Sequence, residues 1–251
     1  MRGILAMLGR NFEVYRKTWK VNALPPLAEP ALYLVAIGFG VGSLINEQVA
    51  GFDYIQFIAP GIIAITMMQT GFTETTYSSY IRLVFQKTWD ACMATPLSVH
   101  DVLWGELAWA ATRAMINAAL MTVVVAAFGL LAWPTAMLIP IIAFIVGMLF
   151  AGIGLIVSSK VKVIDQFSYA FFLFITPQFL FSGTFFPLGN LPNWALWVAR
   201  ALPLTHAAQV TRAAGLELWS NDLWLSIGYL AVASTILPWV AVRAMRKRII
   251  S

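Results

Sequence analysis

Six long apolar stretches constrain the fold of this chain more than any other feature of its sequence. A helix needs about 20 largely apolar residues to cross the hydrocarbon core of a bilayer. Stretches of that kind cover residues 24–45, 55–77, 106–131, 136–158, 167–186 and 223–242. Only 11% of the 251 residues are charged, whereas soluble domains carry about 25%. We therefore predict an all-α membrane protein in which residues 1–251 form a single domain of six transmembrane helices.

The lysines and arginines predict the orientation of the chain. Thirteen of the 16 fall before the first stretch, between the second and third, between the fourth and fifth, or after the sixth. Only Arg200 and Arg212 fall on the other side, and Arg113 lies within a stretch. Because cytoplasmic loops carry the excess of basic residues, we expect both termini in the cytoplasm, N-in and C-in. Basic residues at span ends, rather than on a soluble face, also argue against nucleic acid as a partner.

Residues 1–22 have the pattern of an amphipathic helix. The large apolar residues on one side of the helical wheel are Ile4, Leu8, Phe12, Tyr15 and Trp19, with the charged residues on the other side. A helix of this kind lies in the membrane interface, whereas a solvated basic tail has no reason to keep apolar residues in phase. Charges interrupt the run before any cleavage site, which argues against a signal peptide.

Residues 78–105 form the largest cytoplasmic segment of this topology. We predict a short helix over residues 83–94, ended by the Thr95-Pro96 pair, and a second helix that begins near Val99 and runs into the third span. Ser98 followed by Asp101 fits a capping box at that second start. The segment is either a docking surface for a soluble partner or an interfacial connector between two spans. These residues by themselves favour the connector.

Three ionisable residues lie in apolar surroundings: Glu74 in the second span, and Glu106 and Arg113 in the third. Ionisable residues at such depth are costly and are almost always paired. We expect Arg113 to pair with Glu74 or with Glu106. Such a pair either holds the helices together or acts as a gate that rearranges when the helices move.

Two further patterns concern the surfaces of single spans. The fifth span is rich in phenylalanine around Pro177, which predicts a kinked helix. Its aromatic surface serves either packing or the binding of a flat or acyl-bearing solute. Small residues at helical spacing in the fourth span predict close helix contact, and these are Gly147, Ala151, Gly154 and Ser158.

Several kinds of chemistry are missing from the sequence. It contains no G-x-x-x-x-G-K-[ST] loop for ATP phosphates, and no G-x-S-x-G or H-E-x-x-H motif. The single cysteine, Cys92, and two widely separated histidines offer neither a disulfide framework nor a zinc-ligand cluster. We therefore expect no catalytic residue, no metal and no cofactor in this chain.

Three segments carry a resemblance to a known family. They are "LAEPALYLVAIGFGVG" at the first span, "QKTWDACMATPLSVHDVLWGELAWAATRA" across the cytoplasmic segment, and "FLFSGTFFPLGNLPNWALWVARALPLTH" after the fifth span. They look like the membrane subunit of an ABC transporter of the ABC-2 type, and in particular resemble the NodJ-like permeases of nodulation-factor export systems. The resemblance covers nearly the whole chain, and the third segment is its most specific part.

The resemblance implies roles that the residue patterns leave open. Residues 78–105 become the coupling segment that docks onto a separate ATPase subunit, with residues 1–22 as an interface helix beside it. The implied coupling residues are Phe85, Trp89, Asp90, Met93, Thr95, Pro96 and Leu97. The substrate path is expected to include Gln69, Thr73, Phe172, Pro177, Phe181 and Phe185.

In this family, short helices after the fifth span dip into the outer leaflet without crossing it. The resemblance places such re-entrant helices in residues 187–215, where Pro192 and Pro203 stand at positions suited to a helix start. Trp and Arg are typical of the headgroup level. The implied outer-leaflet anchors are Trp194, Trp197, Arg200, His206 and Arg212.

The same resemblance implies a homodimeric permease of an exporter in the bacterial inner membrane. Two copies of a NodI-like ATPase subunit, which bind ATP and Mg, would power it, and membrane lipids would surround it. The expected cargo is an amphipathic substrate such as a lipo-oligosaccharide, a glycolipid or a drug-like molecule. The alternatives are a passive channel or a structural membrane scaffold, neither of which needs a nucleotide-binding partner, and an intramembrane transferase.

Overall fold

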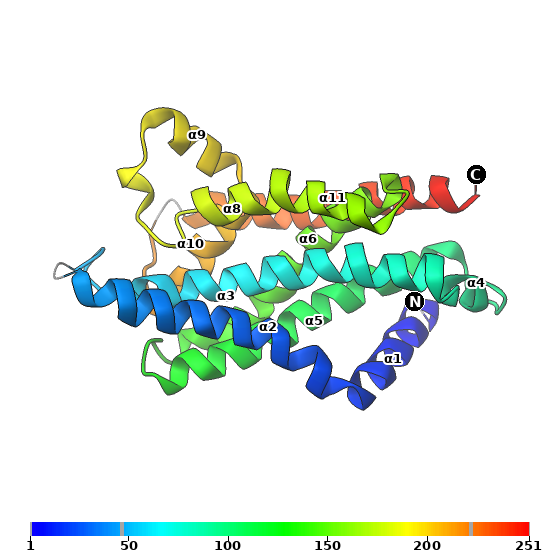
Figure 1. The fold of residues 1–251 in the computed structure, drawn as a ribbon, viewed down its shortest axis with the longest axis horizontal. Coiled ribbons are helices and arrows are strands. Elements are labelled where there is room, and N and C mark those ends of the chain that lie inside the picture. Colours follow the sequence, from blue (N-terminus) through cyan, green and yellow to red (C-terminus); the bar gives the residue numbers. More distant parts are fainter. Residues whose placement is uncertain (1, 46–47, 221–222, 251) are drawn as a thin grey trace.

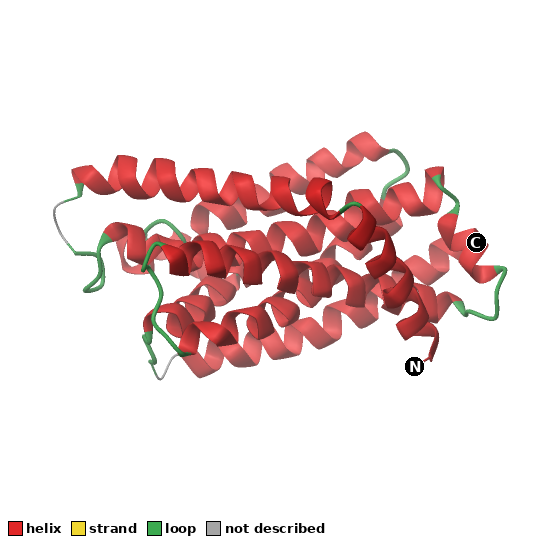
Figure 2. Ribbon diagram, turned by 90° about the horizontal axis from the view of Figure 1, so that it is seen from below, coloured by secondary structure: helices red, strands yellow, loops and turns green. Residues whose placement is uncertain are grey.

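The protein is an elongated bundle of helices that run along its long axis (Figure 1). The computed structural model describes residues 2–45, 48–220 and 223–250. Within these ranges the chain forms helices joined by loops, with one isolated β-bridge between Val49 and Phe52. The view at right angles shows the same long helices, aligned side by side along the long axis (Figure 2). The predicted all-α fold class is confirmed for the described residues.

The first half of the chain contributes the N-terminal elbow and two long helices. The elements are α1 (Arg2–Lys17), α2 (Trp19–Tyr33) with a π-helical continuation (Leu34–Val41) and a 3-10 turn (Gly42–Leu44), α3 (Tyr54–Thr73) with π-helical segments (Glu74–Ser78 and Ile81–Phe85), α4 (Thr88–Met93) and α5 (Val99–Ala127). Ser98 and Asp101 form the capping box predicted at the start of α5.

The second half of the chain alternates long and short helices. The elements are a 3-10 turn (Thr135–Leu138), α6 (Ile139–Lys160), a 3-10 turn (Ile164–Gln166), α7 (Phe167–Ala170), a π-helical segment (Phe171–Ile175), α8 (Thr176–Phe181), a 3-10 turn (Leu188–Asn190), α9 (Asn193–Ala201), α10 (Pro203–Leu216) and α11 (Leu223–Ile250).

Four helices in the described ranges are long and apolar enough to cross a membrane. They are Tyr54–Phe85, Val99–Ala127, Thr135–Lys160 and Leu223–Ile249, and they correspond to the second, third, fourth and sixth predicted spans. The first predicted span is helical, but its apolar part, Ala28–Leu44, is shorter than these. The fifth span, predicted over residues 167–186, begins where α7 begins but was predicted to end too far along the chain. Its helix ends at Phe181, because Gly183 takes a left-handed backbone conformation that turns the chain.

Helix α6 occupies the centre of the bundle, in contact with α3, α5 and α11. Its small-residue face is buried, as the sequence predicts. A Cβ atom on Gly147 would lie 2.5 Å from the Cβ of Ala114 on α5, and one on Gly154 would lie 2.8 Å from the carbonyl oxygen of Phe72 on α3. The helix backbones therefore approach as closely as glycine allows.

Both chain termini and α4 lie at one end of the bundle, which we call the α4 end (Figure 1). Helices α9 and α10 lie at the opposite end, which we call the α9 end. The predicted helix over residues 83–94 is wrong as a single element. Residues up to Phe85 continue α3, and Lys87, with φ of +52°, breaks the chain before α4 begins. That left-handed residue cannot belong to a right-handed helix.

The N-terminal amphipathic helix is also shorter than predicted. Helix α1 ends at Lys17, and a second helix, α2, leads from Trp19 directly toward the first predicted span. The inner side of α1 packs on α5, where Met7 and Asn11 are buried. Phe12 of α1 and Trp19 at the start of α2, which the helical wheel placed with the apolar face, are exposed. The α1–α2 elbow therefore presents apolar side chains both to the protein and to its surroundings.

Candidate functional site

An exposed surface surrounds α4 at the α4 end, and it contains most of the predicted coupling residues. Phe85 is 65% exposed, and Asp90, Thr95 and Pro96 are exposed as well. Met93 and Leu97 are half-buried. We call the exposed group Phe85, Asp90, Thr95 and Pro96 the α4 surface. It joins apolar, acidic and rigid side chains from the end of the α3 extension, from α4 and from the turn after α4, a composition suited to contact with another protein.

Trp89 differs from the other predicted coupling residues because it is completely buried. Its ring packs with Met7, Leu103 and other apolar residues of α1, α5 and α11. Its indole Nε1 has no hydrogen-bond partner in the described structure. The side chain therefore fixes α4 to the bundle, and it does not reach the surface where a partner would bind.

A network of charged side chains links the π-helical extension of α3 to α5 near the α4 end. Arg113 forms an ion pair with Glu74, one of the two pairings expected from the sequence. The alternative pairing with Glu106 is wrong, because the carboxylate of Glu106 lies 2.6 Å from Nη2 of Arg82 instead. The same nitrogen of Arg82 lies 2.8 Å from Glu74. Two cations and two carboxylates thus alternate in one chain of contacts.

Neutral groups complete this network. Ser79 donates to Glu106 at 2.9 Å, and the side-chain amide of Asn11 donates to Glu106 at 3.4 Å. Arg113 donates to the backbone carbonyl of Asn22 at 3.2 Å. Glu74 and Glu106 are almost fully buried. Pairing with cations and hydroxyl donors compensates for the cost of burying these carboxylates.

Arg82 and its neutral partners were missed by the sequence interpretation. Arg82 was assigned to a cytoplasmic loop, because the predicted second span ended at residue 77. The signal was available, since Arg82 lies eight residues after Glu74 and the π-helical segments keep them on one helix. Asn11 carried no such signal, because its contact with Glu106 joins residues 95 positions apart.

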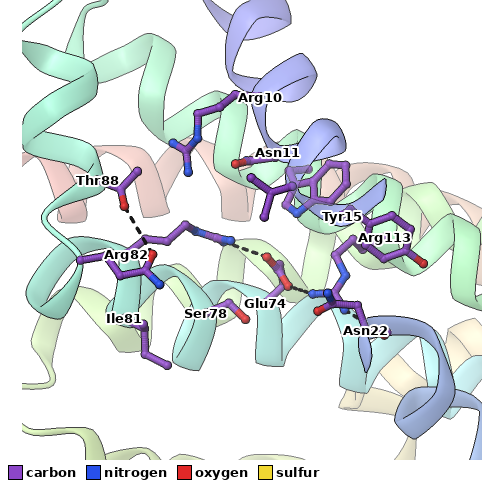
Figure 3. A pocket seen from close by; sticks show the side chains of 13 residues that line it. Arg10, Asn11, Tyr15, Asn22, Glu74, Ser78, Ile81, Arg82, Thr88 and Arg113 are labelled. Atoms are coloured by element: carbon purple, nitrogen blue, oxygen red, sulfur yellow. Dashed lines mark hydrogen bonds and ion pairs between the residues drawn. The ribbon is translucent and has the colours of Figure 1, made fainter. Parts of the chain in front are cut away.

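The network forms one wall of a cavity of about 470 Å³ between the α1–α2 elbow and the α3 and α5 helices. Figure 3 shows Arg10 of α1 above the cavity, and Glu74 between Arg82 and Arg113 below it. The lining residues that are exposed to the surroundings are Val14, Ile81 and Gln86. The cavity therefore combines a charged interior with a mostly apolar rim.

The residues predicted for a substrate path are spread over two surfaces. Gln69 and Thr73 are partly exposed on α3, which is otherwise mostly buried. Phe172 is 74% exposed on the π-helical segment after α7. Phe185 packs on Phe179 with ring centroids 5.0 Å apart. The ring centroid of Phe181 lies 6.3 Å from that of Trp194 on α9. Pro177 stands in the first turn of α8.

The two short helices predicted after the fifth span are present. Helix α9 begins directly after Pro192, and α10 begins at Pro203. Helix α9 projects from the bundle (Figure 1), with Trp194 65% and Trp197 71% exposed. Helix α10 is instead largely buried against α3 and α11. The buried Gln178 of α8, which sequence reasoning missed, accepts a hydrogen bond from the backbone N–H of Leu204 in the first turn of α10.

His206 joins α9, α10 and α11 rather than projecting outward. Its Nε2 lies 2.9 Å from the carbonyl of Arg200 and must donate there, and its Nδ1 lies 2.9 Å from the hydroxyl of Ser226. The ring stacks on Tyr229 at a centroid distance of 4.2 Å. Burial lowers the pKa of His206, although the bond to the Arg200 carbonyl opposes that shift. The neutral ring is therefore favoured in the folded protein.

Arg212 points into the protein, whereas Arg200 lies exposed beside Trp197. Arg212 donates to the carbonyls of Phe57 at 3.2 Å, Gly183 at 3.2 Å and Thr184 at 3.4 Å, and it lies 3.9 Å from the Phe57 ring centroid. Burial lowers the pKa of Arg212 to about 10, which leaves it charged at neutral pH. It holds α10 to the start of α3 and to the turn after α8.

Comparisons with known proteins agree on one family. The family model of the ABC-2 type transporter matches residues 2–216. The chain is 31% identical over 248 residues to nodulation protein J of Sinorhizobium fredii, covering 98% of this chain and 94% of the relative. It is 33% identical over 247 residues to nodulation protein J of Rhizobium leguminosarum bv. trifolii, covering 98% and 94%. It is 23% identical over 222 residues to the inner membrane transport permease YadH of Escherichia coli, covering 88% and 86%.

Proposed function

The chain belongs to the ABC-2 type transporter family and is a membrane permease of an ABC transporter, and from that premise we propose that it exports an amphipathic substrate outward across the bacterial inner membrane. A homodimer of the chain would form the path, and two copies of a NodI-like ATPase subunit would power it. ATP and Mg would be bound by those subunits, since this chain has no phosphate-binding loop.

The observation that carries this proposal is the α4 surface. Phe85, Asp90, Thr95 and Pro96 are exposed in and around α4, and the buried Trp89 ties α4 to α1 and α5. A partner that moves α4 would therefore also move α1 and the cytoplasmic half of α5. The family premise favours a docking role for this segment over the connector role that the residues alone favour.

The orientation follows from the position of the basic residues. The α4 end carries the basic residues of α1, of the α3–α4 turn, of the α6–α7 loop and of the end of α11. The α9 end carries Arg200 and Arg212. By the positive-inside rule the α4 end would face the cytoplasm. The six-span topology would then be completed by the helix over residues 28–44 and the helix over residues 167–181.

At the opposite end, α9 suits a position in the outer leaflet. Its exposed Trp194 and Trp197 have the amphipathic character of headgroup anchors, and exposed Arg200 lies beside Trp197. His206 and Arg212 would support α9 and α10 from within rather than contact lipid. The exposed aromatic surface around Phe172 would face either the second protomer or the acyl part of the cargo, for which a lipo-oligosaccharide, a glycolipid or a drug-like amphiphile is proposed.

The test is reconstitution of the full chain with its ATPase subunit in lipid vesicles. We expect co-purification, ATP hydrolysis and ATP-dependent movement of a fluorescent amphiphile. Asp90→Arg and Pro96→Glu, on the α4 surface, should each weaken association by about tenfold or more, as for central interface residues. Lys160→Glu, an exposed charge reversal at the same end of the bundle, serves as the matched control and should leave association unchanged.

Three results would contradict the proposal. Association that survives Asp90→Arg and Pro96→Glu as well as it survives Lys160→Glu would remove the coupling role of α4. Solute movement without ATP, from a chain that binds no ATPase subunit, would instead support the passive channel. An absence of both movement and partner would support the scaffold.

A further inference from the structure

The cavity behind the α1–α2 elbow carries an excess of positive charge. Arg10, Arg82 and Arg113 line it together with one carboxylate, Glu74. Glu106 adds a second negative charge behind the wall, where it pairs with Arg82. Three cations therefore face two carboxylates, and one positive charge is left without a counter-charge among the side chains described here.

Arg10 is the cation that the network does not neutralise. Its hydrogen bond goes to the sulfur of Cys92 at 3.3 Å, a weak acceptor. In the described part of the chain no carboxylate lies within 4.0 Å of its guanidinium. Figure 3 shows this guanidinium on the cavity side of α1, facing Arg82 across the opening. An arginine in this position has several N–H donors free for a ligand.

The two arginines of the network also keep unused donors. The Nε atoms of Arg82 and Arg113 are buried and lack a hydrogen-bond partner in the described structure. A buried donor without an acceptor is costly, and natural proteins leave few of them. Two neutral side chains that can also donate, Ser78 and Gln86, line the same cavity, whereas Asn22 and Thr88 already donate to Thr18 and to Gln86. The site is therefore rich in donors and poor in acceptors, which is the composition of an oxyanion site.

The rim of the cavity indicates the rest of the ligand. Val14 is 54% exposed and Ile81 is 36% exposed, and both line the opening. A cavity of about 470 Å³ lies within the range of about 300–1,000 Å³ for small-molecule sites. It has room for a polar head, and an acyl chain attached to that head could leave past Val14 and Ile81.

We infer that this cavity binds the phosphate headgroup of an anionic membrane amphiphile, held by Arg10 together with Arg82 and Arg113. Guanidinium groups bind phosphate oxygens through paired N–H donors, which makes arginine the preferred residue for this recognition. The inference rests on the proposed function only in placing the α4 end at the cytoplasmic face. There the ligand is either a lipid of the inner leaflet or the charged head of the cargo before export.

The test uses the full chain in an uncharged detergent, without its ATPase subunit. Binding of short-chain phosphatidic acid is measured by titration calorimetry, with short-chain phosphatidylcholine and inorganic phosphate as separate arms. We expect phosphatidic acid to bind and phosphatidylcholine, which has no net charge, to bind at least about tenfold more weakly. Inorganic phosphate at equal concentration should not displace the lipid, because it makes no contact with the apolar rim.

Two variants of α1 make the test specific. Arg10→Gln should weaken phosphatidic acid binding by about tenfold, as expected for loss of one charge-assisted pair. Arg16→Gln removes the same charge from an exposed position of the same helix that does not line the cavity, and it should have no effect. Arg10→Lys keeps the charge but loses the planar fork, and its affinity should fall between that of the wild type and that of Arg10→Gln.

Three outcomes would overturn the inference. Equal weakening by Arg10→Gln and Arg16→Gln would show general attraction to a basic surface. Equally tight binding of phosphatidylcholine would remove the role of net charge. Displacement by inorganic phosphate would assign the cavity to a free phosphate and not to a lipid. Because no ATPase subunit is present, each of these outcomes leaves the coupling experiment with Asp90→Arg unaffected.

Discussion

The carboxylate of Glu106 on α5 lies 2.6 Å from the guanidinium of Arg82 on the extension of α3. Glu106 is fully buried, and Arg82 also holds Glu74. One cation therefore joins two carboxylates that come from different helices, and Arg113 also pairs with Glu74. We expect the stability of the α4 end of the bundle to depend on this arrangement more than on the pairing of Arg113 with Glu74, because Glu106 has no other cation within ion-pair distance among the described residues.

Arg82→Leu is expected to destabilise the protein strongly. Removing one partner of a buried ion pair leaves an uncompensated charge, which costs about 3–5 kcal/mol. The free energy of unfolding should fall by that amount in denaturant titrations in detergent. Lys87→Leu, which removes a nearby exposed cation, is the control and should change it by less than about 0.5 kcal/mol. If the two variants lose equal stability, the network does not hold the helices together.

Gly154→Ala is expected to push α6 away from α3. Its added Cβ would lie 2.8 Å from the carbonyl oxygen of Phe72, which real contacts essentially never show. Overpacking of this kind costs about 1–3 kcal/mol, to be measured as a drop in thermal stability. Gly228→Ala on α11 is the matched control, because nothing lies within 4 Å of its added Cβ. It should be neutral or stabilise by up to about 1 kcal/mol.

Trp89→Ala is expected to act through stability. The ring is fully buried in the cluster with Met7 and Leu103, and truncation of a buried Trp costs about 3–5 kcal/mol. Limited proteolysis should then cut near α4 in the absence of any partner. Trp197→Ala, where the ring is 71% exposed, should leave the pattern unchanged. An intact α4 in Trp89→Ala that still fails to bind an ATPase subunit would instead make Trp89 a direct contact.

The corner between α9 and α10 is expected to open as the pH falls. Burial lowers the pKa of His206 in the folded state, so below the ordinary histidine pKa of about 6.5 the unfolded chain takes up a proton that the folded chain resists. The neutral ring therefore contributes fully to the free energy of unfolding above that pH, and this contribution is lost as the pH falls below it. Hydrogen-exchange protection factors of residues 193–206 should decrease between pH 7.5 and pH 5.5. His206→Gln should remove this pH dependence, and a dependence that survives the change would assign it to another group.

Local patterns predicted the elements that depend on local causes. The capping box of Ser98 and Asp101 starts α5 where predicted, because its hydrogen bonds join residues three apart. Pro192 and Pro203 mark the starts of α9 and α10. The burial of Gly147 and Gly154 follows from helical spacing alone. Errors at the ends of elements came from backbone conformations that no residue pattern predicted. An example is the left-handed Lys87, which separates the extension of α3 from α4.

The candidate site was predicted only in part. Arg113 was predicted to pair with either Glu74 or Glu106, because ionisable residues in apolar spans need partners, and the structure pairs it with Glu74. The choice of Arg82 as the partner of Glu106 was not recognised, and neither was the place of Arg10 above the cavity. Both depend on how α1 and the extended α3 lie against α5. The burial of Trp89 within a segment that looked like surface has the same origin.

The sequence by itself determined that this chain is an all-helical membrane protein, where its long apolar helices lie and which family it belongs to. These properties depend on apolar length and on the order of residues along the chain. Only the tertiary structure decided that Arg212 turns inward, that Trp89 anchors α4, and that three arginines meet at one cavity. Such contacts join residues far apart in sequence, and their free energy depends on distances of a few ångströms that only the packed helices set.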